Sequence, residues 1–205
     1  MSSEVFLVNT EKVLTFNLKN MYYIIGLTGR NAAGKGTIAD LLVKRNFRYH
    51  SLSDTLREEL NQQKMDESRD NLILIGNQLR SQGGPGVLAD LMIKNLATSE
   101  NHIVDSIRNP YEVKSLRRDY PKHKFILISI DAKPKIRFER LLNRGRKGDS
   151  NSWEQFIELE KLEEISDDPN KQQLFNTIKE ADYNLDNSGN LIDLENNLRL
   201  IINSL

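Results

Sequence analysis

The chain has 205 residues and a mass of 23.6 kDa, a length that predicts one domain able to fold on its own hydrophobic core. Its 29 lysines and arginines balance 29 aspartates and glutamates, which argues against a general nucleic-acid binder because such a protein needs surplus basic charge. No cysteine is present, which excludes disulfides, thiolate metal sites, iron–sulfur clusters and thiol nucleophiles.

Residues 1–20 stand apart from the rest of the sequence. They contain a weak pair of strand-like segments, and at Met21 a much stronger strand signal begins. Two interpretations remain open for this segment. It is either an extension upstream of a start at Met21 or a hairpin added to the edge of a sheet.

From residue 22 onward, predicted strands alternate with predicted helices. Apolar runs indicate strands at 22–27, 47–49, 102–105, 124–131 and 183–186. Helices are indicated through 38–42, after a Ser53-Asp54 cap pair, at about 67–81, at 88–96 beyond the Gly83–Gly86 turn, at 136–142 and at 191–201. This alternation predicts an α/β fold with a doubly wound, five-stranded parallel sheet and a ligand at the carboxyl ends of its strands.

A glycine-rich segment lies between the first strand and the first helix: Gly29-Arg30-Asn31-Ala32-Ala33-Gly34-Lys35-Gly36-Thr37. It matches the phosphate-binding motif G-x-x-x-x-G-K-[ST] if glycine is allowed after the lysine. Its glycines let successive backbone amides face one anion, and the positive end of the helix points at the same place. We therefore predict that all nine residues bind ATP, with Lys35 on the β- and γ-phosphates and the Thr37 hydroxyl on Mg²⁺.

This segment resembles the P-loop of nucleoside-monophosphate kinases, among which the form G-K-G-T is typical of adenylate kinases. A second segment, Ser51–Arg57, looks like the S-T-G-D-x-L-R segment of adenylate kinases, with Ser53 in place of the glycine. The resemblance implies that Ser51, Asp54 and Arg57 bind the acceptor, with the guanidinium of Arg57 on its monophosphate. The alternative is an ordinary capped helix that carries a solvated arginine.

The third predicted strand ends in Asp105-Ser106-Ile107-Arg108, which resembles the D-G-F-P-R-T segment of the same enzymes. By this resemblance, Asp105 orients Mg²⁺ through water and Arg108 holds the acceptor phosphate during catalysis. The arginine follows the aspartate by three residues here and by four in the family. A helix cap after the strand is the alternative role for Asp105.

The segment Arg137–Arg146 resembles the D-R-I-x-G-R-R sequence that leads into the kinase lid. Arg140 and Arg144 are four residues apart, so they share one helical face. The resemblance implies that Arg140 packs on the adenine and that Arg144, together with Arg146, reaches the phosphates. The expected catalytic residues are then Lys35, Arg108, Arg140 and Arg144. The charged segment at about 145–171 is then a short helical lid that opens and closes.

Residues 21–205 are thus expected to form one P-loop kinase domain with an acceptor-binding insert at about 53–97. Arg80 belongs to this insert, so we expect it to bind the acceptor as well. A helical hairpin on the surface explains the region around Arg80 equally well.

The motifs predict ATP- and Mg²⁺-dependent phosphoryl transfer to a nucleoside or deoxynucleoside monophosphate. The ending Ala181–Gly189 is instead similar to dephospho-coenzyme A kinases, which phosphorylate a hydroxyl, and Asp54 is then the expected base. The chain is also similar to kinase-like domains fused to deoxycytidylate deaminases, and a nucleotide sensor without turnover stays open.

No apolar run is long enough to span a membrane, and no signal peptide is recognised in the sequence. We therefore expect a cytoplasmic protein whose partner is a small nucleotide and neither nucleic acid nor a membrane. Nothing in the sequence encodes a readable oligomeric state.

Overall fold

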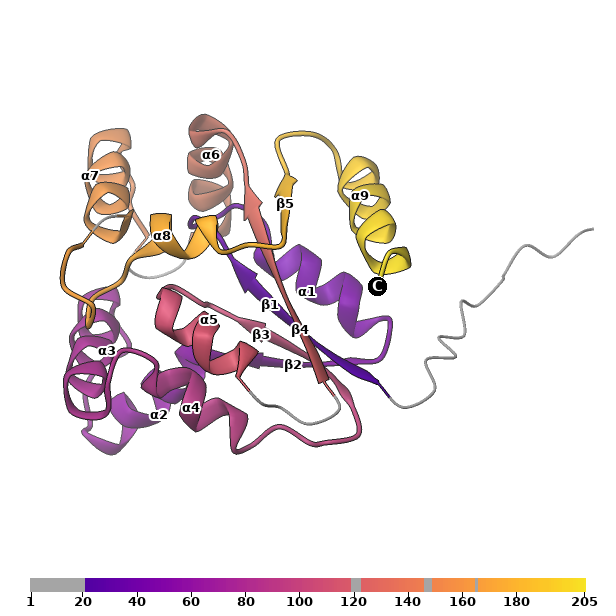
Figure 1. Ribbon diagram of the computed structural model, residues 1–205. Coiled ribbons are helices and arrows are strands. Elements are labelled where there is room, and N and C mark those ends of the chain that lie inside the picture. The colour runs from indigo at the N-terminus through magenta and orange to yellow at the C-terminus, as the bar shows by residue number, and fades with distance from the viewer. Residues whose placement is uncertain (1–20, 119–122, 146–148, 165) are drawn as a thin grey trace, which may run out of the picture.

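The computed structural model describes residues 21–118, 123–145, 149–164 and 166–205. Within these residues, five strands alternate with helices that cover both faces of one sheet (Figure 1). The strands are β1 Tyr22–Thr28, β2 Phe47–Ser51, β3 Asn101–Asp105, β4 His123–Asp131 and β5 Tyr183–Asp186. Neighbouring strands are all parallel, in the order β2-β3-β1-β4-β5, which confirms the predicted α/β fold with a five-stranded parallel sheet.

The connections between the strands are mainly helical. In the part of the chain that the structure describes, the helices are α1 Lys35–Val43, α2 Leu52–Gln62, α3 Arg69–Gly83, α4 Val87–Ile93, α5 Pro110–Arg117, α6 Pro134–Arg144, α7 Trp153–Glu164, α8 Leu174–Lys179 and α9 Leu191–Asn203. The predicted break at Gly83–Gly86 separates α3 from α4, and there Gly84 adopts a φ of 89° that favours glycine.

Helix α2 begins earlier than the sequence predicts. The predicted cap pair Ser53-Asp54 is wrong, because Ser51 at the end of β2 is the N-cap and its Oγ accepts a hydrogen bond from the Ser53 amide. The strand therefore passes directly into the helix, and Asp54 falls in the first helical turn. This sharp change of direction brings the start of α2 to the carboxyl edge of the sheet.

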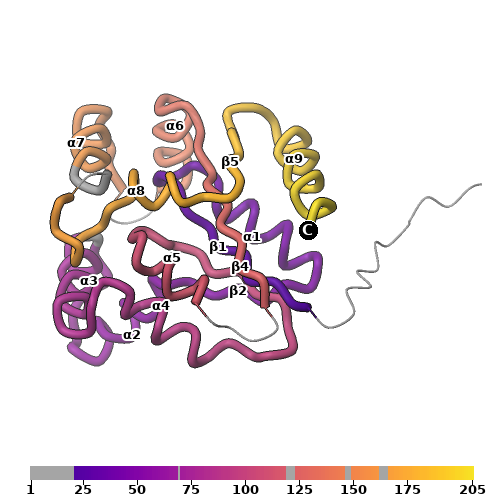
Figure 2. The backbone as a smooth tube through the Cα atoms, viewed as in Figure 1, coloured from indigo at the N-terminus to yellow at the C-terminus, as the bar shows by residue number. Residues whose placement is uncertain are grey.

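Both faces of the sheet are buried. The neighbours Ile24 and Ile25 in β1 are fully buried on opposite faces because side chains alternate along a strand. Helices α1 and α9 cover the Ile25 face, and α2, α4 and α5 cover the Ile24 face, as the chain path in Figure 2 shows. Strands buried on both sides have continuous apolar sequences, which is the pattern that predicted β1 and β4.

The strand order also fixes where a ligand binds. Strand β1 is central, with β3 on one side and β4 on the other, so the chain changes its direction of winding at β1. The loops that follow β1 and β3 therefore diverge at the carboxyl edge and leave a crevice between them. The glycine-rich segment occupies the first of these loops.

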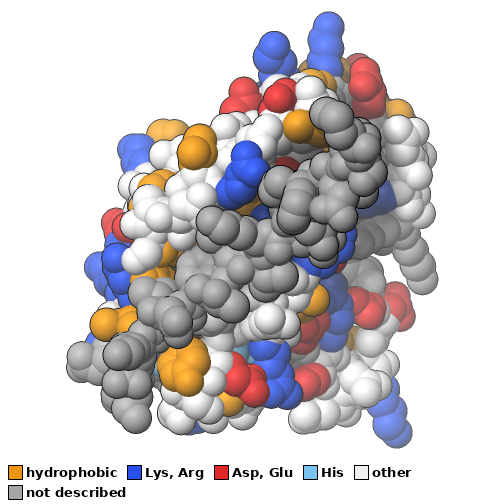
Figure 3. Space-filling view, turned by 90° about the vertical axis from the view of Figure 1, so that its right-hand side faces the viewer, with side chains coloured by type: hydrophobic (Ala, Val, Ile, Leu, Met, Phe, Trp, Pro, Cys, Tyr) orange, Lys and Arg blue, Asp and Glu red, His pale blue; other side chains and the backbone are white. Residues whose placement is uncertain are grey.

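Two expectations concern the surface and the ends of the chain. The weak strands predicted in residues 1–20 lie outside the described residues. Among the residues that are described, no helix has both the length and the apolar character needed to cross a bilayer. On the face in Figure 3, basic and acidic side chains are interspersed.

Candidate functional site

The loop after β1 closes only because two of its positions are glycine. Gly29 has a φ of 134°, and a Cβ there would lie 2.0 Å from the carbonyl oxygen of Ile130. Gly34, the N-cap of α1, has a φ of 107°, and a Cβ there would lie 2.1 Å from Nδ2 of Asn187. The spacing of the motif is therefore a steric requirement of the loop.

The loop presents donors towards the space in front of it. The first amides of a helix have no partner within the helix, and those of Gly36 and Thr37 find none elsewhere in the described residues. Lys35 Nζ donates to the carbonyl oxygens of Gly29 at 2.8 Å and of Arg30 at 3.1 Å. Amides at a helix start together with an ammonium group form a binding place for an anion.

A cavity of about 440 Å³ opens in front of this loop, a size typical of small-molecule sites. Its charged lining, within the described residues, consists of five cations and one carboxylate: Lys35, Arg57, Arg108, Arg140, Arg144 and Asp105. The other residues that line it are Asn31, Ala32, Gly34, Gly36, Thr37, Tyr49, Ser53, Leu72 and Ser106. A concave surface with this excess of positive charge attracts an anionic ligand.

Two arginines of α6 border the loop, as the spacing of four predicts. Arg140 Nη2 donates to the carbonyl oxygen of Asn187 at 2.9 Å, and its Nη1 lies 3.5 Å from that of Ala33. Arg144 Nη2 donates to Oδ1 of Asn31 at 3.0 Å, and the guanidinium also binds both oxygens of Asp149. Helix α6 is thereby fixed against the P-loop.

The opposite side of the cavity carries Arg57 and Arg108. Arg57, in α2, donates to Asp54 at 2.8 Å and also pairs with Glu67. Arg108, in the loop after β3, donates from Nη1 to Oε1 of Gln172 at 3.3 Å. These two guanidinium groups come from different elements and face the P-loop across one cavity.

The carboxylate of Asp105 lies at the carboxyl end of β3, next to the P-loop. Its Oδ1 accepts the amide of Ser106 at 2.5 Å, and its Oδ2 accepts the hydroxyl of Tyr49 at 3.2 Å. Burial, together with the negative charge of Asp105, raises the pKa of Tyr49 to about 12, so the phenol stays protonated and donates. Mg²⁺ is typically held by one or two carboxylates plus phosphates and water, a pattern that Asp105 and Thr37 fit because both line the cavity.

Three residues of the predicted ATP-binding loop pack against the rest of the protein and do not face the cavity. Gly29 packs against β4, and Ala33 is fully buried. Arg30 forms an ion pair of 2.5 Å with Asp131 at the end of β4. None of the three lines the cavity.

Three residues of the predicted acceptor site also lie outside the main cavity. Ser51 is buried, and its hydroxyl donates to that of Ser106 at 3.1 Å. Asp54 is half exposed and pairs with Arg57, since it sits on the outer side of the first turn of α2. Arg80 is buried in an ion pair of 2.8 Å with Glu112 and lines a separate, smaller pocket.

Sequence reasoning missed several residues of the site. Tyr49, Ser53, Leu72 and Ser106 line the cavity without having been predicted to bind anything. Ser53 and Ser106 lie just after the ends of β2 and β3, inside segments that had been singled out, so this position was an available signal. Tyr49 carried no such signal, because its role depends on the pairing of β2 with β3.

The predicted lid is more firmly packed than its charged sequence indicates. Phe156 of α7 is buried against Phe138 of α6, with Trp153 beside them. Buried Arg137 of α6 pairs with Glu160 of α7. These aromatic contacts and this ion pair fasten α7 to α6. The opening and closing of the lid stays a prediction. Arg146 lies outside the described residues.

The chain is similar to several known proteins. Residues 25–163 match the family model of an AAA domain. A UPF0200 protein of Methanocaldococcus jannaschii is 33% identical over 190 residues, which cover 89% of this chain and 92% of the relative. A UPF0200 protein of Pyrococcus furiosus is 33% identical over 144 residues, covering 68% of this chain and 77% of the relative.

Solved structures share the fold. TT1252 from Thermus thermophilus superposes with a TM-score of 0.58 at 20% identity, covering 90% of this chain and 98% of that one. Shikimate kinase from Bacteroides thetaiotaomicron gives a TM-score of 0.53 at 15% identity, covering 89% and 99%. At these identities the likeness is one of fold, and it confirms the predicted resemblance to P-loop kinases. The chain therefore has a P-loop kinase fold with an AAA domain match, and it belongs to the UPF0200 family.

Proposed function

We propose that this protein transfers the γ-phosphoryl group of ATP, in the presence of Mg²⁺, to the phosphate of a nucleoside or deoxynucleoside monophosphate. The observation that carries the proposal is the placement of two sets of cations on opposite sides of one cavity. Lys35, Arg140 and Arg144 lie at the P-loop, whereas Arg57 and Arg108 lie beyond the ends of β2 and β3. Such an arrangement suits two anions that approach each other.

In the proposed reaction, the bond between the γ-phosphorus and the β–γ bridging oxygen breaks. A phosphate oxygen of the acceptor forms the new bond, and the products are ADP and a nucleoside diphosphate. Because a phosphate acceptor is already anionic at neutral pH, it needs positioning and charge neutralisation and no general base. Lys35, Arg140 and Arg144 would stabilise the charge on the transferred group, and Mg²⁺ held near Thr37 and Asp105 would neutralise the β- and γ-oxygens.

The alternative of a hydroxyl acceptor has less support. It calls for a carboxylate within hydrogen-bond reach of the hydroxyl. Asp54, the base expected from the sequence, pairs with Arg57 and does not line the cavity. Asp105 is the one carboxylate of the lining within the described residues, and the proposal assigns it to Mg²⁺.

A screen of acceptors tests the proposal. The full chain is incubated with ATP, Mg²⁺ and each ribo- or deoxynucleoside monophosphate, or dephospho-coenzyme A, and the products are separated by ion-exchange chromatography. We expect ADP and a diphosphate from at least one monophosphate. Transfer only to dephospho-coenzyme A would replace the proposal with the hydroxyl reaction. Tight nucleotide binding without any product would identify a sensor.

A further inference from the structure

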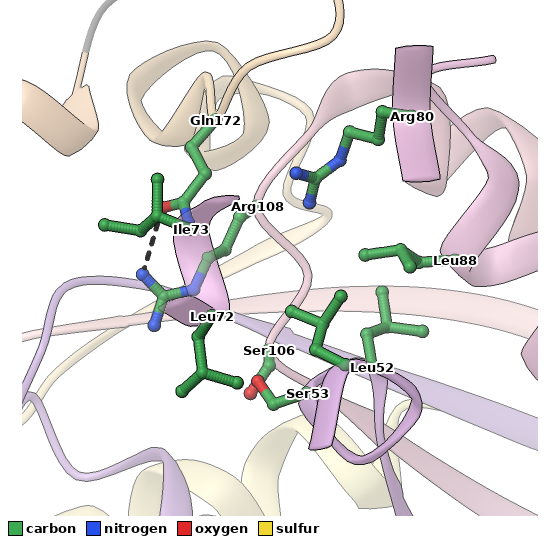
Figure 4. A pocket seen from close by; sticks show the side chains of 10 residues that line it. Leu52, Ser53, Leu72, Ile73, Arg80, Leu88, Ser106, Arg108 and Gln172 are labelled. Atoms are coloured by element: carbon green, nitrogen blue, oxygen red, sulfur yellow. Dashed lines mark hydrogen bonds between the residues drawn. The ribbon is translucent and has the colours of Figure 1, made fainter. Parts of the chain in front are cut away.

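We infer that the acceptor carries a single-ring, pyrimidine-type base, which enters a second pocket beside the main cavity and is held there by Arg80. This inference rests on the proposed function, because it concerns the part of the monophosphate that does not react. The second pocket lies between α2, α3, α4 and the loop after β3 (Figure 4). Its apolar walls are formed by Leu52, Leu56, Leu72, Ile73 and Leu88.

The second pocket adjoins the main cavity. Ser53, Leu72, Ser106 and Arg108 line both, so one molecule can extend from one space into the other. Arg108 stands at this junction, where Figure 4 shows its guanidinium beside Gln172. A ligand whose phosphate is held by Arg108 thus places its uncharged portion against the apolar walls.

The size of the second pocket limits what can enter it. Its volume is about 80 Å³, and it is partly open. An enclosed apolar cavity of about 150 Å³ in another protein binds one benzene ring. The smaller, open pocket therefore receives most of one six-membered ring, and a fused two-ring base would have to push its walls apart.

Arg80 provides a fixed donor in this pocket. Its Nε and Nη2 both donate to Oε1 of Glu112, at 3.2 Å and 2.8 Å, and the side chains of both residues are buried. The other oxygen of Glu112 accepts the amides of Arg108 at 2.8 Å and Asn109 at 3.1 Å. The carboxylate therefore holds the guanidinium in place and ties it to the loop that carries Arg108.

One nitrogen of this guanidinium remains for a ligand. Nη1 of Arg80 makes no hydrogen bond within the described residues, although Arg80 lines the pocket. A guanidinium can only donate, so its partner on a ligand is an acceptor such as a ring carbonyl. Pyrimidine bases offer a carbonyl on a single ring. Adenine lacks one, and guanine carries its carbonyl on a fused pair of rings.

The test is steady-state kinetics on the full chain with ATP and Mg²⁺, comparing UMP, CMP and dTMP with AMP and GMP. We expect kcat/KM to be at least tenfold higher for a pyrimidine than for either purine. Equal or higher values for a purine would overturn the inference and leave the proposed function standing. No transfer to any monophosphate would overturn both, so the two failures are distinguishable.

Two variants test the roles of the pocket. Leu72→Ala widens the pocket at a half-buried position, and we expect it to raise kcat/KM for purines relative to pyrimidines. The control is Leu74→Ala, at an exposed position on the same helix, which should leave this ratio unchanged. Arg80→Lys keeps a positive charge beside Glu112 and should lower kcat/KM for the pyrimidine by roughly 10- to 100-fold with the KM for ATP unchanged. An unaltered base preference in both variants would contradict the inference.

Discussion

The buried side chain of Asn187 donates a hydrogen bond of 2.8 Å to the backbone carbonyl of Ala33, a residue of the P-loop that lies 154 positions earlier in the chain. The backbone amide of Asn187 also donates to the carbonyl of Asp131, at 2.7 Å. The loop after β5 is thereby attached both to β4 and to the P-loop. The shape of the phosphate-binding loop thus depends on the last part of the chain as well as on its own glycines.

Replacing Asn187 by alanine tests this dependence. The buried Ala33 carbonyl would keep only its long contact with Arg140, so we expect a loss of about 1–2 kcal/mol in the free energy of unfolding. We also expect the Kd for ATP to rise by roughly tenfold, because the loop loses a support. Urea denaturation and isothermal calorimetry measure the two quantities, with the exposed Asn196→Ala as the control. A loss of stability with an unchanged Kd would show that Asn187 contributes to folding and not to ATP binding.

Arg57 and Arg108 are predicted to bind the acceptor. Because each removes one charged partner of the acceptor phosphate, Arg57→Ala and Arg108→Ala should raise the acceptor KM by roughly tenfold or more. The KM for ATP should change by less. Initial rates with each substrate varied in turn give both constants, and Arg118→Ala, at an exposed arginine outside the cavity, serves as the control. If the ATP KM rises instead, the two subsites have been exchanged.

The packing of α7 against α6 depends on the pair formed by Arg137 and Glu160. Arg137 is 2% exposed and also donates from Nε to the Ala132 carbonyl at 2.8 Å. Glu160→Gln leaves this buried guanidinium without its closest anion, which should lower the unfolding free energy by about 3 kcal/mol. Urea denaturation of this variant and of the exposed Glu158→Gln provides the comparison. Equal free energies of unfolding for the two variants would mean that water solvates Arg137 and compensates for the lost attraction of Glu160.

Histidines that are distant in sequence meet on the sheet. His50 Nε2 lies 3.1 Å from Nδ1 of His102, whose Nε2 lies 2.8 Å from the carbonyl oxygen of Ala97. If Nε2 of His102 carries the proton for Ala97, its Nδ1 accepts from His50, an arrangement that requires neutral His102. Burial, more than any neighbouring charge, lowers the pKa of both rings below the ordinary value of 6.5.

This shift gives the stability a defined dependence on pH. The unfolded chain binds more protons at these histidines than the folded chain, so stability falls as the pH drops below 6.5 and is retained above it. His102→Gln removes one titrating ring, and we expect a smaller drop in the urea midpoint between about pH 7.5 and pH 5.5. Parallel curves for the variant and the natural protein would show that other groups cause the drop.

The parts of the fold that the sequence predicts correctly are those that depend on neighbouring residues. The strands β1 and β4 were identified because burial on both faces demands continuous apolar runs. The P-loop was identified because steric limits at Gly29 and Gly34 impose a fixed spacing. The break between α3 and α4 follows from the conformational freedom of Gly84, whose φ is 89°.

The features that the sequence does not reveal depend on residues far apart in the chain. Arg80 could not be distinguished from a surface arginine because its partner Glu112 lies 32 residues away. Tyr49 reaches Asp105 only because β2 and β3 are adjacent. The sharp start of α2 turned Asp54 away from the cavity. Trp153 and Phe156 pack the charged helix α7 against Phe138 of α6, a contact that depends on residues in two different helices.

If the P-loop holds ATP for transfer of its γ-phosphoryl group, the reaction depends on Lys35. ATP labelled in the γ-position is mixed with Mg²⁺, the preferred monophosphate and either the natural chain or Lys35→Ala, with the exposed Lys44→Ala as the control. We expect label in the diphosphate product with the natural chain and with Lys44→Ala, and at least a hundredfold slower labelling with a folded Lys35→Ala protein. Near-normal labelling by Lys35→Ala would show that the P-loop does not hold the reacting ATP.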